Sequence, residues 1–564
     1  MMRALGVGLW NLLTAASLLV RVPLRWALAR PAPPYVRFEL QGDPPYRPPP
    51  RRWLPRRAPH GRVAALDAFR RRLEELGADR RVRGIVLEVG RLEMAPAKRL
   101  LVARWLRAFR ARNKEVVGFA VSPGNAEYAL LCEASRVVLP RPGRLALDGF
   151  LLEATALGQA LERLGVRPEF VRRGEFKTAP ELFTRSDISP NQQMLLDSLL
   201  DDRHGELVEA VSAGRRLEPD QARLRVDEGP YSAERALAAG LVDALADEAE
   251  LPSLLGLPDP GRGDARVPDF DSYRRSRRLP VVRWGKLRTR PRLAVVPVAG
   301  IIAEGEGLPA RPGPAVAGSE SLLPGLRAAG EDRRCPAVLL YVNSPGGSAL
   351  ASERVADEVA RLARRKPVIA YTDRVAASGG YLLSLGAKEL WAGPHAVIGS
   401  IGVFAGKFDL SLLLERLGIR RTAYTRGAHA GLGTLARPMT DAERGALERE
   451  VEEMYRRFLD RVGESRKLDA QAVLARAEGR VFTAGRALAE GLLDRLGTFE
   501  EAVARALELA GLAGPDGGLV VHGLPRRRLG LASLVPRRAQ VLALWWPWIS
   551  GEGLSGHEAF GGER

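Results

Sequence analysis

The strongest constraint on the fold of this chain is an internal repeat whose two copies lie about 250 residues apart. Asp79-Arg-Arg81 and the apolar run at 85–89 recur 253 residues later as Asp332-Arg-Arg334 and the run at 338–342. The other matches are RLGVR (163–167) with RLGIR (416–420), and YSAERALAAGLVD (231–243) with FTAGRALAEGLLD (482–494). Each copy has roughly 200 residues, far more than a solenoid unit. The repeat therefore predicts two tandem domains of one fold within the 564 residues.

The stretches outside the repeats differ from them in composition, and the whole chain is predicted to have six segments. In chain order these are a membrane anchor (1–30), a Pro- and Arg-rich spacer (31–60), a first repeat (61–250), a linker (251–292), a second repeat (293–512) and a C-terminal tail (513–564). The tail carries VLALWWPWI at 541–549. Its three tryptophans suit either a membrane headgroup zone or an oligomer contact.

The N-terminal segment has the pattern of a membrane helix. Residues 4–20 are apolar apart from three polar side chains, and with the segment to Leu24 they reach the length of a transmembrane helix. A cleaved signal peptide is the alternative, because Ala27-Leu-Ala29 suits a cleavage site. The apolar run is long for a signal peptide, which favours a retained anchor. More arginines follow the run than precede it, so the positive-inside rule alone would keep most of the chain cytoplasmic.

Composition excludes several classes of partner. The net charge is +19, but the chain has no nucleic-acid recognition motif, so no nucleic-acid partner is expected. Much of the excess charge lies in arginine-rich stretches (51–72, 274–292 and 526–538), which suit anionic membrane lipid. No metal-ligand spacing and no complete nucleotide loop occur, so neither a metal nor a cofactor is predicted. The two cysteines, Cys132 and Cys335, are predicted to be buried free thiols.

The stretch with the clearest chemistry runs from Ala337 to Phe404. Its pattern predicts a strand at 337–342, a helix to about 364, a strand at 367–372 and a helix from 378. This is a βαβ unit with a parallel sheet. Two glycine loops follow the strands, Asn343–Ser348 and Ala376–Gly380. Either loop alone is typical of an ordinary turn. Together they offer a serine at a helix start and unshielded backbone N–H groups, which acyl transfer requires.

The two repeats differ where this chemistry would occur. At the offset of 253, Ser378 corresponds to Asn125, and the Gly-Gly loop corresponds to Gly90–Met94, which has no tandem glycines. Conversely, Lys177 corresponds to Ala430. Lysine is scarce in this chain, and arginine cannot give up its proton, so a retained lysine calls for a chemical reason. Each repeat is therefore predicted to supply one member of a nucleophile–base pair.

The paired loops resemble those of the crotonase-like serine peptidases, which include the Clp-type proteases. The continuation Gly399–Val403 resembles the signal peptide peptidase A (protease IV) family, in its long, duplicated form. The resemblance covers about 60–250 and 290–510. It implies an α/β fold with two tandem crotonase-like domains and an N-terminal transmembrane helix.

The same resemblance implies a set of site residues. The family's lysine motif, G-x-Y-K-S, stands here as Gly174–Thr178, with Phe176 for tyrosine and Thr178 for serine. Neither change removes the base, which must be neutral to act and which burial at a domain interface could keep neutral. The roles implied are Ser378 as nucleophile, Lys177 as general base, Ser400 as the hydroxyl that orients the lysine, and Gly379 with Gly346 or Gly347 as the oxyanion hole.

Other bases and other functions remain open from the residues alone. His395 is the rival base because it follows Ser378 by 17 residues, and Lys388 and Lys407 are weaker candidates. Ser400 could be an ordinary turn serine. A crotonase-like acyl-CoA enzyme could use the same glycine loops, and a membrane scaffold could have lost catalysis altogether.

The resemblance implies a membrane-bound serine endopeptidase that degrades cleaved signal peptides and similar apolar peptides. It further implies contact with membrane lipid and assembly into a homotetramer. The expected location is the bacterial inner (plasma) membrane, which the chain would cross once. The catalytic body would lie on the periplasmic or outer face.

Overall fold

The computed structural model describes residues 2–28, 31–47, 61–257, 266–276, 292–308, 315–512 and 518–521. These residues form two compact units. The first unit contains 2–150 and 204–276, and the second contains 151–203 and 292–521. The units do not follow the predicted repeat boundaries, because 151–203, assigned by sequence to the first repeat, packs within the second unit.

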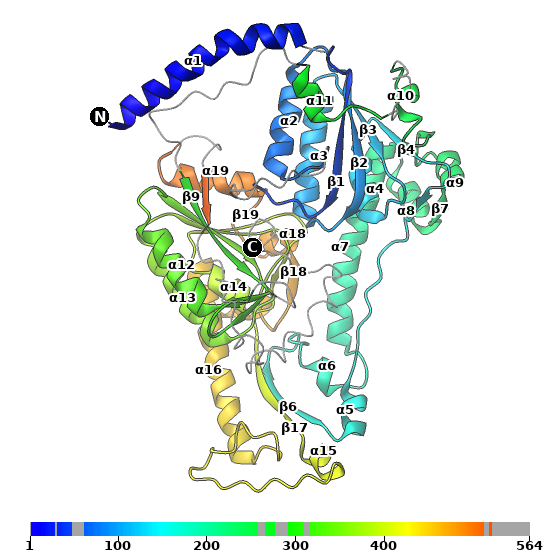
Figure 1. Cartoon of the computed structure of the whole chain (residues 1–564). Coiled ribbons are helices and arrows are strands. Elements are labelled where there is room, and N and C mark those ends of the chain that lie inside the picture. The colour runs from blue at the N-terminus through cyan, green and yellow to red at the C-terminus, as the bar shows by residue number, and fades with distance from the viewer. Residues whose placement is uncertain are drawn as a thin grey trace. The chain divides into compact units, whose positions relative to one another are not determined.

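The first unit is built on a five-stranded sheet in which every neighbouring pair of strands is parallel (Figure 1). In spatial order its strands are β1 (Tyr35–Gly42), β2 (Gly84–Leu92), β3 (Glu115–Phe119), β4 (Arg136–Leu139) and β8 (Ala244–Leu245). A short antiparallel pair joins β5 (Arg144–Leu145) and β7 (Tyr231–Ser232). The helices are α2 (Leu66–Ala78), α3 (Pro96–Arg110), α4 (Asn125–Leu131), α8 (Pro219–Asp227), α9 (Ala233–Ala238), α10 (Leu251–Leu254) and α11 (Phe270–Arg275). Helix α7 (Pro190–Arg215) has residues in both units.

The second unit has a six-stranded parallel sheet. In spatial order its strands are β19 (Arg495–Leu496), β15 (Glu389–Ala392), β13 (Val368–Thr372), β12 (Ala337–Asn343), β9 (Arg292–Ala299) and β20 (Gly518–Val521). Five of these strands follow the order of the first sheet, with β9, β12, β13, β15 and β19 in place of β1, β2, β3, β4 and β8. Strands β12, β13 and β15 each begin 253 residues after their counterparts.

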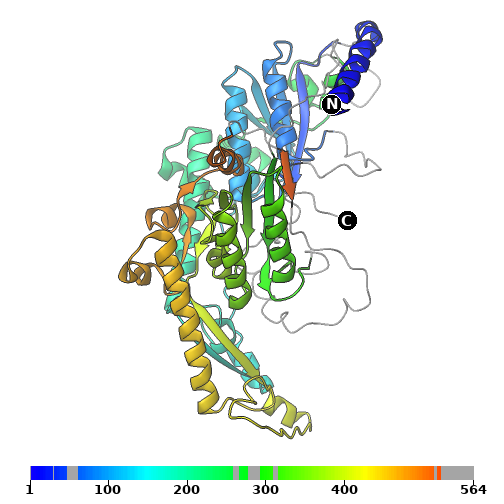
Figure 2. The same ribbon diagram turned by 90° about the vertical axis from the view of Figure 1, so that its left-hand side faces the viewer.

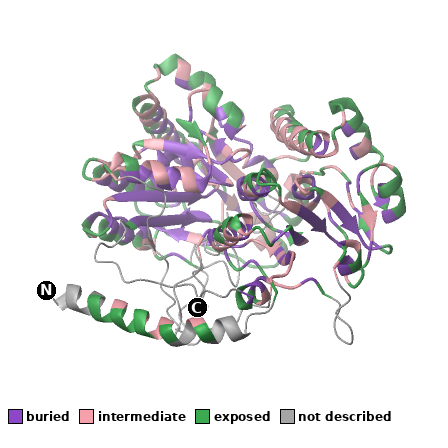
Figure 3. Cartoon of the chain, turned by 90° about the horizontal axis from the view of Figure 1, so that it is seen from above, coloured by how far each residue is buried: buried purple, intermediate pink, exposed green. Residues whose placement is uncertain are grey.

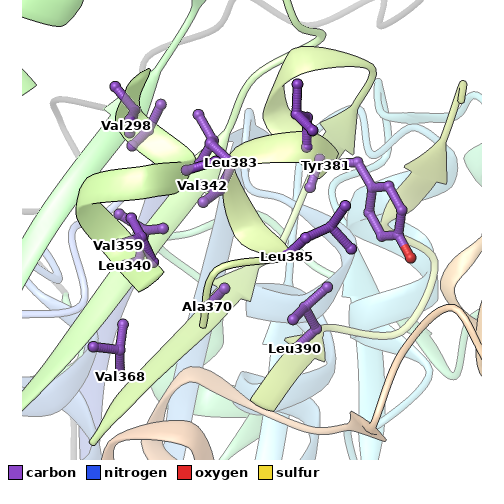
Figure 4. Close-up of a cluster of buried hydrophobic side chains, with 14 of the residues drawn as sticks. Val298, Leu340, Val342, Val359, Val368, Ala370, Tyr381, Leu383, Leu385 and Leu390 are labelled. Atoms are coloured by element: carbon purple, nitrogen blue, oxygen red, sulfur yellow. The ribbon is translucent and has the colours of Figure 1, made fainter. Parts of the chain in front are cut away.

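Helices cover both faces of the second sheet, which explains its continuous apolar strands. Alternate residues of β12, such as Leu340 and Val342, pack with α12 (Ser319–Glu331) and α13 (Ala349–Ala363), shown in green in Figure 2. Tyr341 faces the other way, and its ring packs at 6.0 Å on Phe499 of α19 (Phe499–Leu509). Figure 4 shows the first of these two layers, into which α14 (Gly379–Ser384) inserts Tyr381 and Leu383.

Smaller elements complete the second unit. A three-stranded sheet contains β14 (Val375–Ala377), β16 (Val397–Gly399) and β18 (Val481–Thr483). A two-stranded antiparallel ribbon pairs β17 (Val403–Asp409) with β6 (Arg167–Arg173). The other elements are α5 (Gly158–Leu164), α6 (Glu181–Thr184), β10 (Ile301–Ala303), β11 (Val316–Gly318), α15 (Ser411–Arg416), α16 (Asp441–Arg466), α17 (Ala470–Arg476) and α18 (Ala484–Ala489). Helix α16 runs beside the ribbon (Figure 2).

The stretch predicted as a spacer, 31–60, is in part a strand of the first sheet. Val36, Phe38 and Leu40 of β1 are fully buried, and the nearby prolines flank the strand without interrupting it. Strand β1 therefore pairs in parallel with β2. Residues 48–60 of the predicted spacer lie outside the described residues.

The predicted linker and tail also contain folded elements. Within 251–292, helix α11 places Phe270 at 5.9 Å from the ring of Phe38. Within the tail, β20 pairs in parallel with β9. The tryptophan-rich run at 541–549 lies outside the described residues.

Helix α1 (Met2–Leu28) covers most of the predicted membrane anchor, and its described side chains are largely exposed (Figure 3). Across the parts of the chain that the structure describes, no helix combines the length and the apolar character that crossing a membrane requires. The predicted transmembrane helix is therefore not confirmed. The two cysteines are free and buried, as predicted.

Candidate active site

Ser378 stands at the junction between β14 and α14. Its φ of 52° lies in a region that residues with side chains rarely adopt, and its N–H donates to Gly399 O at 2.8 Å. The next helix is fixed in the core, because Tyr381 and Leu383 are almost fully buried. A strained serine at a strand-to-helix turn is how several hydrolases present a nucleophilic Oγ.

The glycine loop after β12 lies directly against this serine. Gly346 has a φ of 107°, and a Cβ at that position would come within 2.7 Å of Ser378 Cβ. Gly347 has a φ of 148°, and its Cβ would come within 2.0 Å of Ile302 O. Gly346 therefore allows the loop to approach Ser378, and Gly347 allows it to approach the backbone of Ile302.

Hydrogen bonding distinguishes the three glycines predicted to form the oxyanion hole. The N–H of Gly346 donates to Ser344 Oγ at 3.1 Å, so it is already occupied. The N–H groups of Gly347 and Gly379 donate no hydrogen bond to any other residue that the structure describes. The structure therefore favours Gly347 over Gly346 as the partner of Gly379.

The structure brings Lys177 and Ser378 together within the second unit. Lys177 Nζ lies 3.0 Å from Ser378 Oγ, 2.9 Å from Ser400 Oγ and 3.0 Å from Ser400 O. These three oxygens hold the amine at one point. The Ser400 hydroxyl therefore lies within hydrogen-bond distance of the amine, as a group that orients the lysine would have to.

Burial changes the acid–base character of the lysine. The side chain is 4% exposed, and the loss of solvation lowers the pKa of its amine from 10.5 to about 7. A substantial fraction of the amine is then neutral at neutral pH. The residues around it all belong to the second unit, so the burial does not need the domain interface that the sequence suggested.

A turn that sequence reasoning missed, Glu478–Arg480, holds the lysine loop. The N–H of Phe176 donates to Glu478 O at 2.6 Å, and the N–H of Glu175 donates to Glu478 Oε2 at 2.9 Å. Gly479 has a φ of 80°, and a Cβ there would come within 2.3 Å of the backbone N of Lys177. Only glycine fits this position without displacing the lysine.

The other side of the same turn holds the loop that carries Ser400. The N–H of Ser400 donates to Arg480 O at 2.6 Å, and the N–H of Gly479 donates to Ile401 O at 2.8 Å. One turn thus fixes the lysine and its neighbouring serine relative to each other. The contacts to the lysine loop join residues about 300 positions apart, and those to the Ser400 loop join residues about 80 apart, so the only local signal was a glycine between two charged residues.

The rival bases lie elsewhere in the second unit. Lys388 is exposed, and Lys407 Nζ donates to Thr434 O at 2.8 Å and to Arg437 O at 2.9 Å. His395 belongs to the turn that leads into β16. The amine beside Ser378 Oγ is that of Lys177. Among the described residues, no group of three or more metal-ligating side chains occurs.

A half-buried hydroxyl, a buried amine at hydrogen-bond distance and two N–H donors with no acceptor among the described residues are the parts of a serine-type acyl-transfer site. Comparison with known proteins agrees with this class. Peptidase family S49 matches residues 108–254 and 360–513, which together make up more than half of the chain. The chain belongs to peptidase family S49.

Several curated relatives are similar to most of the chain. Serine protease SPPA, chloroplastic, from Arabidopsis thaliana is 30% identical over 77% of this chain and 64% of its own length. Protease 4 from Haemophilus influenzae is 30% identical over 78% of this chain and 72% of its own length. Protease 4 from Salmonella typhi is 30% identical, with coverages of 77% and 70%. The chain thus spans about two thirds of the length of these relatives.

Proposed function

We propose that this protein is a serine endopeptidase in which Ser378 is the nucleophile and Lys177 is its general base. The observation that carries the proposal is the buried Lys177 amine, with its pKa lowered to about 7, at 3.0 Å from Ser378 Oγ. Membership of peptidase family S49 supports peptide bonds as the substrate.

The residues of the site account for each step of the reaction. The neutral amine of Lys177 takes the hydroxyl proton while Ser378 Oγ attacks the peptide carbonyl carbon. The N–H groups of Gly347 and Gly379 stabilise the resulting oxyanion. The lysine ammonium then gives its proton to the departing amine, and an acyl-enzyme remains. The same lysine, now neutral, activates the water molecule that hydrolyses the acyl-enzyme. Ser400 keeps the amine directed at Ser378 throughout.

An apolar surface beside the site supports apolar peptides, such as cleaved signal peptides, as substrates. Strand β17 begins directly after Gly402, where an added Cβ would lie 3.2 Å from Lys177 Cδ. Four half-buried aromatic rings cluster here, with neighbouring centroids 5.2–6.1 Å apart. They are Phe170, Phe404 and Phe408 of the ribbon and Phe183 of α6. Apolar side chains of an extended peptide would be accommodated beside such a surface.

The proposal extends to a homotetramer attached to the bacterial inner membrane, with its catalytic body on the outer face and two crotonase-like repeats. The family resemblance of the sequence carries these features. Light scattering of the purified protein measures the subunit number. Protease protection in intact and opened membrane vesicles measures the side on which the body lies, and a body protected on the cytoplasmic side would contradict the proposal.

Covalent labelling tests the proposed chemistry directly. A fluorophosphonate should form a stable adduct on Ser378, identified by peptide mass spectrometry, and block cleavage of an apolar reporter peptide. Ser378→Ala should abolish both the adduct and the cleavage. An acyl-CoA enzyme would bind CoA and form no serine adduct. A scaffold would neither bind CoA nor form the adduct. Absence of the adduct in the folded protein would overturn the proposal.

A further inference from the structure

The ribbon of β6 and β17 takes one strand from each sequence repeat. The repeats align without gaps between 149–177 and 402–430, where they share the run Glu-Arg-Leu-Gly and the flanking glycines. By this alignment residues 420–425 correspond to the first six residues of β6, and residues 151–156 correspond to the last six of β17. Each repeat therefore contains both strand segments, although the ribbon uses only one from each.

The two remaining segments look like strands without partners. Among the described residues, neither 151–156 nor 420–425 belongs to a strand or pairs with one. Every residue of 420–425 is exposed, and Tyr424 is 90% exposed. In 151–156, exposed and half-buried residues alternate, which is the period of a strand with one covered face. Segment 420–425 (RRTAYT) also contains strand-favouring residues and no proline.

The backbone around 420–425 already has the conformation found around β6. Gly418 has a φ of 69°, and its counterpart Gly165 has a φ of 80°. Gly427 has a φ of 97°, and its counterpart Gly174 has a φ of 102°. Helix α15 precedes the segment as α5 precedes β6. The segment is therefore bounded by the same turns that bound a paired strand in the other repeat.

We propose that 420–425 of one copy pairs with 151–156 of a second copy, antiparallel and in the register of the β6–β17 ribbon. That register, carried over from the β6–β17 pairs, places Ala154 opposite Thr422, as Lys407 lies opposite Glu169. It also places Glu153 diagonally across from Arg421, so opposite charges meet on one face. An exposed, unpaired strand is a template for such pairing.

The contact is head to tail, because each copy offers two different segments. Such an interface generates a closed ring if its rotation closes. The inference deepens the self-association included in the proposed function, and it specifies the segments that would form the interface. It does not depend on catalysis by Ser378.

Disulfide trapping between separate copies tests the register. Ala154→Cys and Thr422→Cys are made in separate full-length chains carrying different tags, then mixed and mildly oxidised. The natural cysteines are both buried and do not compete. A mixed disulfide dimer is expected as the main product. The matched control replaces Thr422→Cys with Ala423→Cys, one residue out of register, and should give at least tenfold less mixed dimer.

A second pair of variants tests the proposed strand pairing without introducing cysteines. Thr422→Pro removes a backbone N–H and should shift the assembly to smaller species in light scattering, whereas Thr422→Val at the same exposed site should not. Failure to form the mixed dimer, equal yields in both registers, or an unchanged assembly in Thr422→Pro would overturn the inference. A trapped mixed dimer in an assembly that is not a tetramer would support the inference and contradict only the proposed subunit number.

Discussion

The two units share a strand order but differ at the loops beyond the ends of their strands. In the first unit the carboxylate of Glu127 accepts the N–H of Leu92 at 2.6 Å and the N–H of Gly124 at 3.0 Å. In the second unit the position of Glu127 is taken by Gly380, and the N–H groups of Gly347 and Gly379 have no acceptor among the described residues. A carboxylate therefore ties the loops of the first unit together, and the second unit has a glycine in its place.

The nucleophile position shows the same contrast. Asn125 is the first residue of helix α4, and its Nδ2 donates to Gly149 O. Ser378 precedes its helix and has a positive φ. The fold alone therefore does not make a site. The strained turn, the tandem glycines and the buried lysine that the proposed site requires occur together, among the described residues, only in the second unit.

Removing either member of the pair should have the largest effect. Lys177→Arg and Ser378→Ala should each lower kcat/KM by at least about 1,000-fold, because a guanidinium stays protonated and alanine has no nucleophile. The exposed Lys388→Arg is the matched control and should keep most of the activity. Circular dichroism checks folding. Activity within tenfold of wild type in folded Lys177→Arg would exclude the lysine as base.

Disturbing the turn that holds the lysine should have the next largest effect. Gly479→Ala should lower kcat/KM by roughly 100-fold, because the new Cβ must displace the backbone of Lys177. Gly485→Ala is the matched control, since a Cβ there meets nothing within 4 Å. Equal activities of the two variants would show that the turn does not position the amine.

The pH dependence follows from the lowered pKa of Lys177. The base must be neutral, so kcat/KM should fall about tenfold per pH unit below about 7 and level off above it. The profile is measured with a neutral peptide across pH 5–9. The same profile is measured in His395→Gln, which removes the rival base and should leave the inflection in place.

Stability should show the cost of burying the amine. In the unfolded chain the pKa of lysine is near 10.5, and in the folded protein it is about 7, so the folded state binds fewer protons between these values. The penalty is complete below pH 7 and disappears as pH rises towards 10.5. Lys177→Met should therefore unfold at a higher temperature than wild type at pH 6, with the difference narrowing by pH 10. A constant difference would contradict the lowered pKa.

Sequence patterns predicted the parts of the site that are local. The strand predicted at 337–342 is β12, and the strand predicted at 367–372 is β13. The Gly-Gly loop and the serine turn follow these strands directly. The features that the sequence did not predict depend on contacts between residues far apart in the chain. Strand β1 lies within a proline-rich stretch, and the turn at 478–480 contacts the lysine loop only in the folded chain.

The scarcity of lysine was informative but ambiguous. Besides Lys177, three of the retained lysines each direct Nζ at two or more backbone carbonyl oxygens, with distances of 2.6–3.1 Å. These are Lys114, Lys366 and Lys407. An ammonium with three donors suits several converging carbonyls. The sequence could therefore mark lysines that have a chemical reason, but only the fold separates a base from a carbonyl-binding cation.

The smallest expected effect is in the first unit and concerns Glu127. Glu127→Ala removes an acceptor from two backbone N–H groups, and should lower the free energy of unfolding by about 2 kcal/mol. The change should leave kcat/KM within twofold of wild type, because the carboxylate only satisfies the loops of its own unit. Urea unfolding and peptide cleavage measure the two quantities. The exposed Glu234→Ala, a change of the same type, should cost less than about 0.5 kcal/mol. If Glu127→Ala were as stable as Glu234→Ala, the carboxylate would not be what satisfies the first unit, and the contrast between the two loop clusters would rest on the glycines alone.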